Sequence, residues 1–246
     1  TDQSLPERML PEILDADLAP TVLTCAVWGA TKLDGLPWLT PPPAANWENA
    51  TRLLDSLGAL EPNGAATARG KRMADLPVHP RLAHMIFEAA AEGAANAACN
   101  LAAILAELPN GGPRRETDLR RIVDLVRARP GDPFAHRVGE LADRWSRGYP
   151  ERDRARLDEG VMLAWAFPDR VAKKRANGSF ALSSGRGATM ELTESLATAD
   201  YLVCAELNDA PGDARIHLAA PISEEAIEDL FKDTITETTV TEWDKR

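Results

Sequence analysis

The chain has 246 residues, of which 44% are apolar and 27% are charged, values that are ordinary for soluble globular proteins. Its 16 Gly and 18 Pro are scattered, which excludes collagen, a coiled coil and wholesale disorder. No run of about 18 apolar residues predicts a transmembrane helix, and the acidic N-terminus lacks the apolar core of a signal peptide. The three cysteines are far apart and odd in number, which favours a reducing cytoplasm over a disulfide framework or a CxxC metal site.

The net charge of −10 is unevenly distributed along the chain. Residues 1–65 carry a net charge of −6, residues 66–190 carry +6, and residues 191–246 carry −10. Arginine supplies 22 of the 28 basic residues, and its planar guanidinium suits bidentate contacts with phosphates and carboxylates. The basic middle therefore indicates either a surface for a nucleic-acid backbone or a salt-bridged, solvated helical surface.

The first 79 residues predict a helix, a connector, a second helix and a hairpin. Apolar stripes at helical spacing cover residues 15–28 and 44–57, and the proline run at 41–43 forbids a helix between them. The Pro-Asn-Gly turn at 62–64 is flanked by short runs that predict a hairpin. This order of elements is typical of a winged-helix domain.

Residues 80–157 predict a small helical bundle. Apolar stripes cover residues 80–108, which Gly93 divides into two helices, and they recur over residues 118–129 and 134–145. Loops rich in Pro and Gly separate these segments, as expected for short connections between antiparallel helices.

In residues 158–246 the sequence pattern changes from helical to strand-like. A short helix over 158–168 is followed by alternating runs that predict a small barrel or sandwich, interrupted by one helix over 223–231. The predicted strands are residues 179–182, 188–192, 201–207, 215–219 and 236–243. The last strand ends close to Arg246, so we expect a barrel that lacks its closing strands and a chain truncated at its C-terminus. The chain also starts at Thr1 rather than Met, which indicates a processed chain or a part of a longer one.

No motif for a self-contained active site is present. The chain has no GxxxxGK[ST] phosphate loop, and the spacing of His79 and His84 is poor for two metal ligands on one helical face. Cys25 and Cys99 lie on apolar helical stripes, where a cysteine is expected to be a small buried hydrophobe. We therefore expect neither a catalytic residue nor a metal site in this chain.

Three blocks of sequence resemble one known family. Gly70–Ile86, GKRMADLPVHPRLAHMI, resembles the joint between the wing and the helical bundle of DEAH-type superfamily 2 helicases. Upstream, PEILDADLAPTVLTCAVWG is similar to the run that follows the second motor domain in that family. Downstream, AWAFPDRVAKKRANGSFALSSGRGATM and the closing TVTEWD resemble the C-terminal region of the bacterial HrpB family. The blocks occur in the family's order, and the resemblance covers nearly the whole chain.

The resemblance implies a multidomain fold that is mostly α, with a β-rich C-terminal part. It implies a winged helix with an N-terminal connector over residues 1–79, a ratchet-like helical bundle over 80–157, and a partial OB-like β region over 158–246. It also implies that RecA-like motor domains, which would bind ATP and Mg, precede Thr1. The chain itself would then hold no cofactor and hydrolyse no ATP.

The implied function is that of a non-catalytic accessory region of a cytoplasmic, ATP-dependent helicase, away from membranes. Its partners would be the motor domains in cis and single-stranded RNA or DNA, which the region would help to guide. Contacts with a nucleic-acid backbone would be independent of sequence and sensitive to salt. The candidate contacts all lie in the basic middle of the chain: Arg69, Lys71, Arg72, Arg114, Arg115, Arg120, Arg121, Lys173, Lys174 and Arg175.

Each group of candidates has a structural alternative. Arg69, Lys71 and Arg72 would otherwise face the motor domains, and Arg81 is equally expected to pair with an acid across the joint. The run 173–175 precedes a turn and a strand, where oligonucleotide-binding folds often contact a backbone. Most of the six tryptophans lie on apolar stripes or beside prolines, so they are expected in the core rather than against bases.

Two other classes of function remain open. A winged-helix DNA-binding regulator with a sensor domain would need a basic recognition helix, but NWENATRLLDSLG has one Arg against two acids. A protein-interaction platform would need no basic surface, and the acidic residues 191–246 favour it for the C-terminal part.

Overall fold

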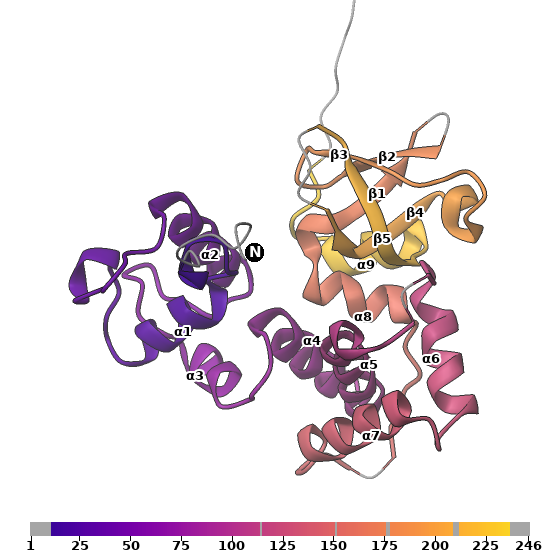
Figure 1. The fold of residues 1–246 in the computed structure, drawn as a ribbon, viewed down its shortest axis with the longest axis horizontal. Helices are drawn as coiled ribbons and strands as arrows, with labels where there is room; N and C mark the ends of the chain where they lie inside the picture. Colours follow the sequence, from indigo (N-terminus) through magenta and orange to yellow (C-terminus); the bar gives the residue numbers. More distant parts are fainter. Residues whose placement is uncertain (1–10, 114, 151, 176–177, 209–211, 237–246) are drawn as a thin grey trace, which may run out of the picture.

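The computed structural model describes residues 11–236, except 114, 151, 176–177 and 209–211 (Figure 1). Helices fill the N-terminal two thirds, and a β barrel follows them. Figure 1 shows the first three helices as a separate lobe, connected through α4 to a helical bundle on which the barrel rests. Among the described residues, no helix has the length and apolarity needed to cross a lipid bilayer.

The N-terminal lobe consists of α1 (Ala19–Val27), α2 (Ala44–Ser56) and α3 (Ala68–Ala74) around its own apolar core. The two predicted helices are confirmed. The predicted hairpin is confirmed in a short form: Leu60 and Ala66 form an antiparallel bridge, and backbone hydrogen bonds join Glu61 to Ala65 and Thr67 to Ala59.

Helix α3 was not predicted, because its seven residues are too few to show an apolar period. It starts at Thr67, whose side chain accepts a hydrogen bond from the backbone of Gly70 at 2.8 Å. A side chain at position 70 would overlap the backbone of Ala59, so glycine allows α3 to pack against the end of the preceding segment.

The helical bundle contains α4 (Pro80–Ala91), α5 (Ala95–Glu107), α6 (Leu119–Ala128) and α7 (Pro133–Trp145). These four helices match the predicted segments, including the division near Gly93. Side chains of Asp118 and Asp132 accept hydrogen bonds from the first turns of α6 and α7, which explains where both helices begin.

Helix α8 (Glu159–Ala166) joins the bundle to the barrel. Four of its apolar residues are buried in a core that also takes in α4–α7 and the outer face of two barrel strands. A side chain at Gly160 would overlap the carbonyl oxygen of Pro221, so α8 lies directly against the barrel. The bundle and the barrel therefore share one continuous apolar core.

The barrel has five described strands: β1 (Val171–Lys174), β2 (Ser179–Leu182), β3 (Gly187–Thr189), β4 (Tyr201–Leu207) and β5 (Ala214–Pro221). Their order is β1-β2-β3-β5-β4, and β4 pairs with β1 to close the barrel. The β3–β5 pair is parallel and the other pairs are antiparallel. Phe180 and Leu202 fill its interior together with other apolar side chains.

The prediction of an unclosed barrel is wrong. Strand β1, which the sequence pattern did not indicate because two of its four residues are lysines, provides the closure. The predicted strand over 236–243 falls almost entirely outside the described residues. Helix α9 (Glu224–Phe231) follows β5 as predicted, and Ile227 and Leu230 pack against the shared core.

Candidate nucleic-acid interface

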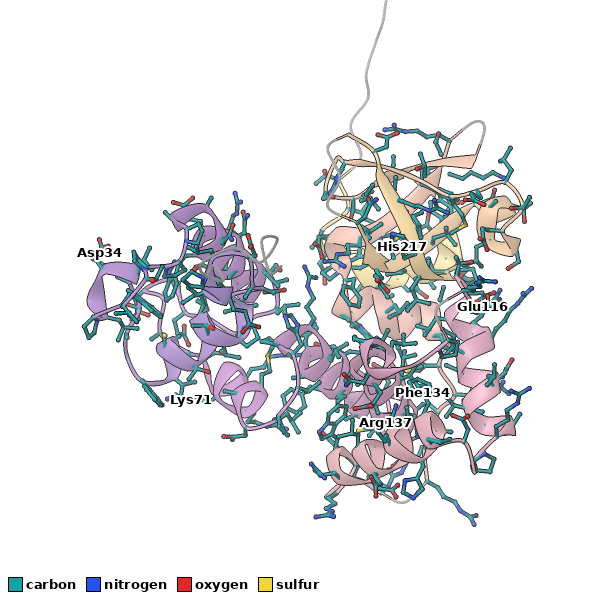
Figure 2. The ribbon with its side chains drawn as sticks, viewed as in Figure 1. Asp34, Lys71, Glu116, Phe134, Arg137 and His217 are labelled. Carbon is teal, nitrogen blue, oxygen red and sulfur yellow. The ribbon has the colours of Figure 1, made fainter. Side chains whose placement is uncertain are left out.

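A cleft of about 590 Å³ lies between the helical bundle and the barrel. Leu82 and Ile122 belong to its apolar wall on the helices, and β4 and β5 line the opposite side. Figure 2 shows His217 on the barrel and Glu116 beside the start of α6. The charged and imidazole side chains that line the cleft are Asp17, His79, Arg81, Glu116, Arg170, Glu206 and His217. The cleft therefore has mixed charge rather than a uniformly basic surface.

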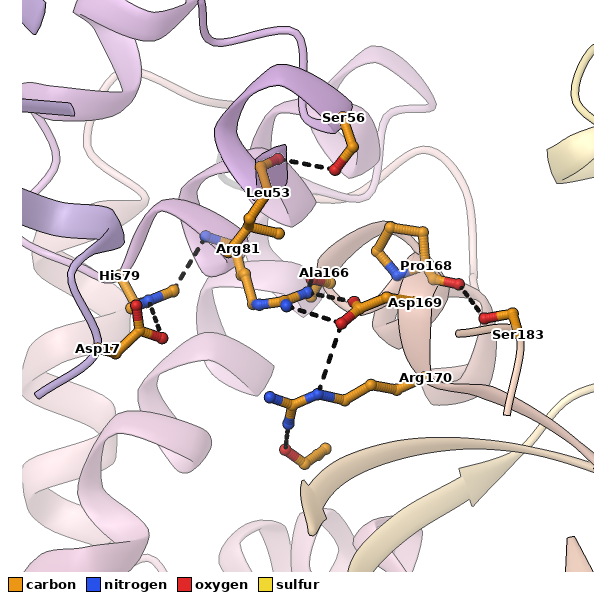
Figure 3. Close-up of polar contacts among 11 residues, drawn as sticks. Asp17, Leu53, Ser56, His79, Arg81, Ala166, Pro168, Asp169, Arg170 and Ser183 are labelled. Carbon is orange, nitrogen blue, oxygen red and sulfur yellow. Dashed lines mark hydrogen bonds and ion pairs between the residues drawn. The ribbon is translucent and has the colours of Figure 1, made fainter. Parts of the chain in front are cut away.

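Arg81 connects the helical bundle to the start of the barrel (Figure 3). It lies in the first turn of α4 and is only 7% exposed. Its Nη1 and Nη2 donate to the two carboxylate oxygens of Asp169 at 2.6 and 3.0 Å, and Nη1 also donates to the carbonyl of Ala166 at 3.0 Å. Arg81 therefore pairs with an acid, as one of the two expectations had it, but across the junction of the bundle and the barrel rather than across the joint with the N-terminal lobe.

The ion pair sets the charge state of Asp169. Burial alone would raise the pKa of this carboxyl, but the hydrogen bonds and the charge of Arg81 outweigh burial and lower it. The Arg81 guanidinium also lies over the ring of Phe167, 5.2 Å from its centre. With these contacts, Arg81 is held in place as a structural cation.

Asp17 and His79 form a second link, between the N-terminal lobe and α4 (Figure 3). The Nδ1 of His79 accepts from the backbone N–H of Arg81 at 3.2 Å, so its Nε2 carries the proton and donates to Asp17, also at 3.2 Å. This hydrogen bond is the main cause that lowers the pKa of Asp17 to about 2. Both links depend on the first turn of α4.

Arg170 lies beside this network and was not predicted. Its Nη1 donates to the carbonyl of Ala205 on β4 at 3.0 Å, and its guanidinium lies 5.0 Å from the centre of the Phe167 ring. Burial, followed by the charge of Arg81, lowers its pKa. The sequence feature that could have indicated Arg170 is the Asp169-Arg170 pair, which directly follows Pro168 after the end of α8.

The predicted cations of α3 differ in accessibility. Arg69 forms an ion pair with Glu88 and a 3.0 Å contact with the Nδ1 of His84, so it holds α3 against α4. Arg72 is exposed and lies over the ring of Phe87, 4.8 Å from its centre. Lys71 is exposed beside it (Figure 2).

Two of the predicted cations before and within α6 form ion pairs with carboxylates close by in the sequence. Arg120 makes two hydrogen bonds to buried Asp118, at 3.0 and 2.7 Å, and Arg121 lies 3.6 Å from Glu116. Arg115 is exposed. Arg114 lies outside the described residues.

The run at the end of β1 also keeps two exposed cations. Lys173 and Arg175 are exposed, with the Nζ of Lys173 5.3 Å from the centre of the Tyr201 ring. Lys174 donates to the carbonyl of Thr198 at 3.2 Å. The run ends β1 and begins the loop that leads to β2.

The structure does not bring the candidates together into one surface. Figure 1 shows α3, the start of α6 and β1 in three different parts of the molecule. Within the part of the chain that the structure describes, the candidate cations that remain exposed and outside local ion pairs are Lys71, Arg72, Arg115, Lys173 and Arg175.

Most of the tryptophans belong to the core, as expected. Trp47 and Trp145 are buried, and Trp38 packs edge-on against Trp47 while its Nε1 donates to the carbonyl of Leu33. Trp28 is the exception at 82% exposed. Trp243 lies outside the described residues.

Comparison with known proteins identifies the chain's relatives. Residues 50–78 match the family model of the helicase associated domain (HA2), winged-helix. The ATP-dependent RNA helicase HrpB of Escherichia coli (strain K12) is 33% identical over 237 residues, which are 95% of this chain and 28% of that protein. The probable ATP-dependent RNA helicase DHX35 of Homo sapiens is 30% identical over 41% of this chain and 14% of its own length.

The similarity extends to three dimensions. A crystal structure of the E. coli DExH-box NTPase HrpB superposes with a TM-score of 0.73 at 31% sequence identity, covering 92% of this chain and 27% of that one. A crystal structure of the E. coli DEAH/RHA helicase HrpB gives a TM-score of 0.71 at 30% identity. The chain thus spans just over a quarter of the length of the HrpB relative it matches. The agreement of sequence and fold along nearly its whole length shows that the chain belongs to the HrpB family of DEAH-type helicases, to whose C-terminal region it corresponds.

Proposed function

We propose that the chain is a non-catalytic accessory region of an ATP-dependent helicase. It binds a single strand of RNA or DNA while RecA-like motor domains of the same polypeptide bind ATP and Mg and hydrolyse the nucleotide. The family relationship supports the accessory role, because the matched relatives are named as ATP-dependent helicases and NTPases. The proposed units are the winged helix over residues 1–79, the ratchet-like bundle over 80–157 and the OB-like region over 158–246.

The observation that carries single-strand binding is the position of the basic run on the barrel. The barrel has five strands in the order β1-β2-β3-β5-β4, which supports an OB-like interpretation. OB folds bind oligonucleotides on the face of strands 2 and 3 and through the loops between strands 1 and 2 and between strands 4 and 5. Lys173 and Arg175 lie at the start of that first loop and are exposed.

The cleft supplies a second group of contacts next to the barrel. Arg170 and His217 line it from the barrel side; the Nε of Arg170 lies 4.0 Å from a carboxylate oxygen of Asp169, and His217 has no carboxylate within ion-pair distance among the described residues. A phosphate backbone that passes from the β1–β2 loop toward the bundle would meet these two side chains. The mixed charge of the cleft fits a strand that is guided and released rather than held tightly.

A titration of a fluorescent single-stranded oligonucleotide, read by anisotropy at several salt concentrations, tests the proposal. The variant Lys173→Glu/Arg175→Glu is expected to raise Kd at least tenfold and to reduce the log–log salt slope by about 1.4, since each contact contributes about 0.7. The matched control Arg127→Glu/Arg129→Glu, with the same change of charge at the C-terminal end of α6, is expected to stay within about twofold of the parent chain. Equal affinity of the first variant and the parent chain would rule out the barrel site.

A second candidate function is protein binding by the N-terminal lobe. Trp28 and Leu39 are fully or largely exposed there, and a groove of about 410 Å³ is lined by apolar side chains that include Trp28 and Trp38. Large exposed apolar residues beside a groove are typical of an interface. We infer that this groove contacts the motor domains in cis. The variant Trp28→Ser/Leu39→Ser is expected to lose co-purification with coexpressed motor domains while it keeps its thermal midpoint.

A further inference from the structure

The barrel strands β4 and β5 depart from a regular ladder where they line the cleft. Their pairing passes over Ala205 on β4 and over His217 on β5, and the register before and after these two residues is the same. Side chains of a regular strand alternate between its two faces, but here two consecutive residues of each strand line the cleft: Ala205 and Glu206, and His217 and Leu218. Bulges re-aim side chains in this way, often next to active sites. The double bulge therefore brings Glu206 and His217 to the cleft together.

The polar side chains of the cleft differ in how far they are already bonded. Three of them form the two links described above, and the carboxylate of Glu116 accepts from the backbone N–H of Asp118 at 3.0 Å. Arg170 donates to a backbone carbonyl of β4 at 3.0 Å. Glu206 and His217 are exposed, and in the ranges that the structure covers neither side chain has a hydrogen bond or an ion pair. A carboxylate and an imidazole are thus available to a ligand, with a guanidinium in the same cleft.

The wall of the cleft that faces these groups is apolar. It consists of leucine and isoleucine side chains of the bundle: Leu82, Leu105, Leu108 and Ile122. A phosphate group would leave this wall uncovered, and its negative charge would be repelled by Glu206. A flat nucleobase can cover such a wall, because extruded bases are held against aromatic or apolar side chains. The volume of about 590 Å³ lies within the range of about 300–1,000 Å³ that is usual for small-ligand pockets.

The unbonded carboxylate determines which bases suit the cleft. An ionised carboxylate accepts hydrogen bonds but donates none, so Glu206 favours a base that presents an amino group. Cytosine presents its N4 amino group, for which Glu and Asp are the usual partners, and its ring acceptors can receive hydrogen bonds from His217 or Arg170. Uracil carries a carbonyl oxygen in place of that amino group. It would therefore place an acceptor against the acceptor-only carboxylate of Glu206.

We propose that the cleft is a base-binding subsite, which takes one unstacked base of the single strand and prefers a base with an exocyclic amino group, such as cytosine. The inference rests on the proposed single-strand function, and it adds base selectivity to backbone contacts that carry no sequence information. The base packs between the apolar wall and the double bulge, and Glu206 accepts a hydrogen bond from its amino group. Single-stranded RNA is commonly recognised through bases that are splayed out and bonded along their Watson–Crick edges.

The experiment measures the affinity of the 246-residue chain for fluorescent oligocytidine and oligouridine RNA of equal length, at one salt concentration. The parent chain is expected to bind oligocytidine at least about fivefold more tightly. Glu206→Gln is expected to bring the two affinities within about twofold, because an amide can both donate and accept. The control Glu225→Gln removes the same charge from an exposed position on α9 outside the cleft, and it is expected to keep the preference. Circular dichroism checks that the variants fold.

The barrel variant Lys173→Glu/Arg175→Glu separates this inference from the proposed function. It is expected to weaken binding of both strands by the same factor and to leave their ratio unchanged. Equal binding of the two strands by the parent chain, or a preference that survives in Glu206→Gln, would overturn the base subsite, even where the barrel variant still weakens both strands and so supports the single-strand function. A preference that depends on Glu206, together with a barrel variant that binds like the parent chain, would support the subsite and overturn the barrel site. Absence of binding to either strand would overturn both.

Discussion

Arg81 and Asp169 are separated by 88 positions in the sequence, yet they form a bidentate ion pair, with Nη1–Oδ1 and Nη2–Oδ2 distances of 2.6 and 3.0 Å. The pair connects the first turn of α4 to the segment that opens the barrel (Figure 3). Since His79, one residue before α4, also bonds to Asp17, the same helix end holds the N-terminal lobe, the bundle and the barrel in one arrangement. The position of the candidate single-strand surface on the barrel, relative to the helices, depends on this junction.

The variant Asp169→Asn is expected to destabilise the chain by about 2–3 kcal/mol. Removing one partner of a buried pair leaves the other charge uncompensated, which costs about 3–5 kcal/mol in a fully buried site. We expect less because the Asp169 side chain is 44% exposed. Urea denaturation measures the change, and Asp124→Asn, whose ion pair is long and exposed, is the matched control. A loss below about 0.5 kcal/mol in Asp169→Asn would show that water replaces the pair without cost.

His84 is expected to make stability depend on pH between about 6.5 and 4. Burial, followed by the nearby charge of Arg69, lowers the pKa of His84 to about 4 from its usual 6.5. Within this interval the unfolded chain binds the proton and the folded chain does not. Stability therefore falls as the pH falls, by up to about 1.4 kcal/mol per pH unit.

Urea midpoints measured across that interval test the effect of His84. The variant His84→Gln is expected to flatten the pH dependence, whereas His136→Gln, at an exposed position, is expected to keep it. Asp17 does not affect the slope in this interval. Its pKa is lowered from 3.8 to about 2, so the stability that it contributes is lost only as the pH falls below 3.8. An unchanged slope in His84→Gln would show that another group carries the acid sensitivity.

The long helices could be predicted from the sequence because their signals are local. Apolar spacing and capping residues such as Asp118 and Asp132 fix α6 and α7 within a residue or two. Helix α3 and strand β1 could not be predicted in the same way. Both are short, and both are stabilised by contacts outside the element itself: α3 packs through Gly70 on Ala59 and also contacts α1, and β1 pairs with β4 to close the barrel.

The candidate site could be predicted only in part for the same reason. The basic run at 173–175 is a local pattern, and the structure leaves two of its residues exposed. Arg69 and Arg120 look equally accessible in the sequence, but their carboxylate partners become apparent only when α3 meets α4 and Asp118 is buried. Eight acids lie among the twelve arginines of residues 114–156, and the sequence alone does not show which of these residues form ion pairs.

A pair of glycine substitutions tests the packing of α8 against the barrel. A Cβ atom added at Gly160 would overlap the carbonyl oxygen of Pro221. A Cβ atom added at Gly139 on α7 would have no neighbouring atom within 4 Å. Gly160→Ala is therefore expected to cost about 3 kcal/mol or more, because both the helix and the strand are fixed by the shared core. Gly139→Ala is expected to stabilise the chain by up to about 1 kcal/mol through helix propensity. Thermal and urea unfolding measure both, and a Gly160→Ala variant as stable as the parent chain would contradict the close contact between α8 and β5.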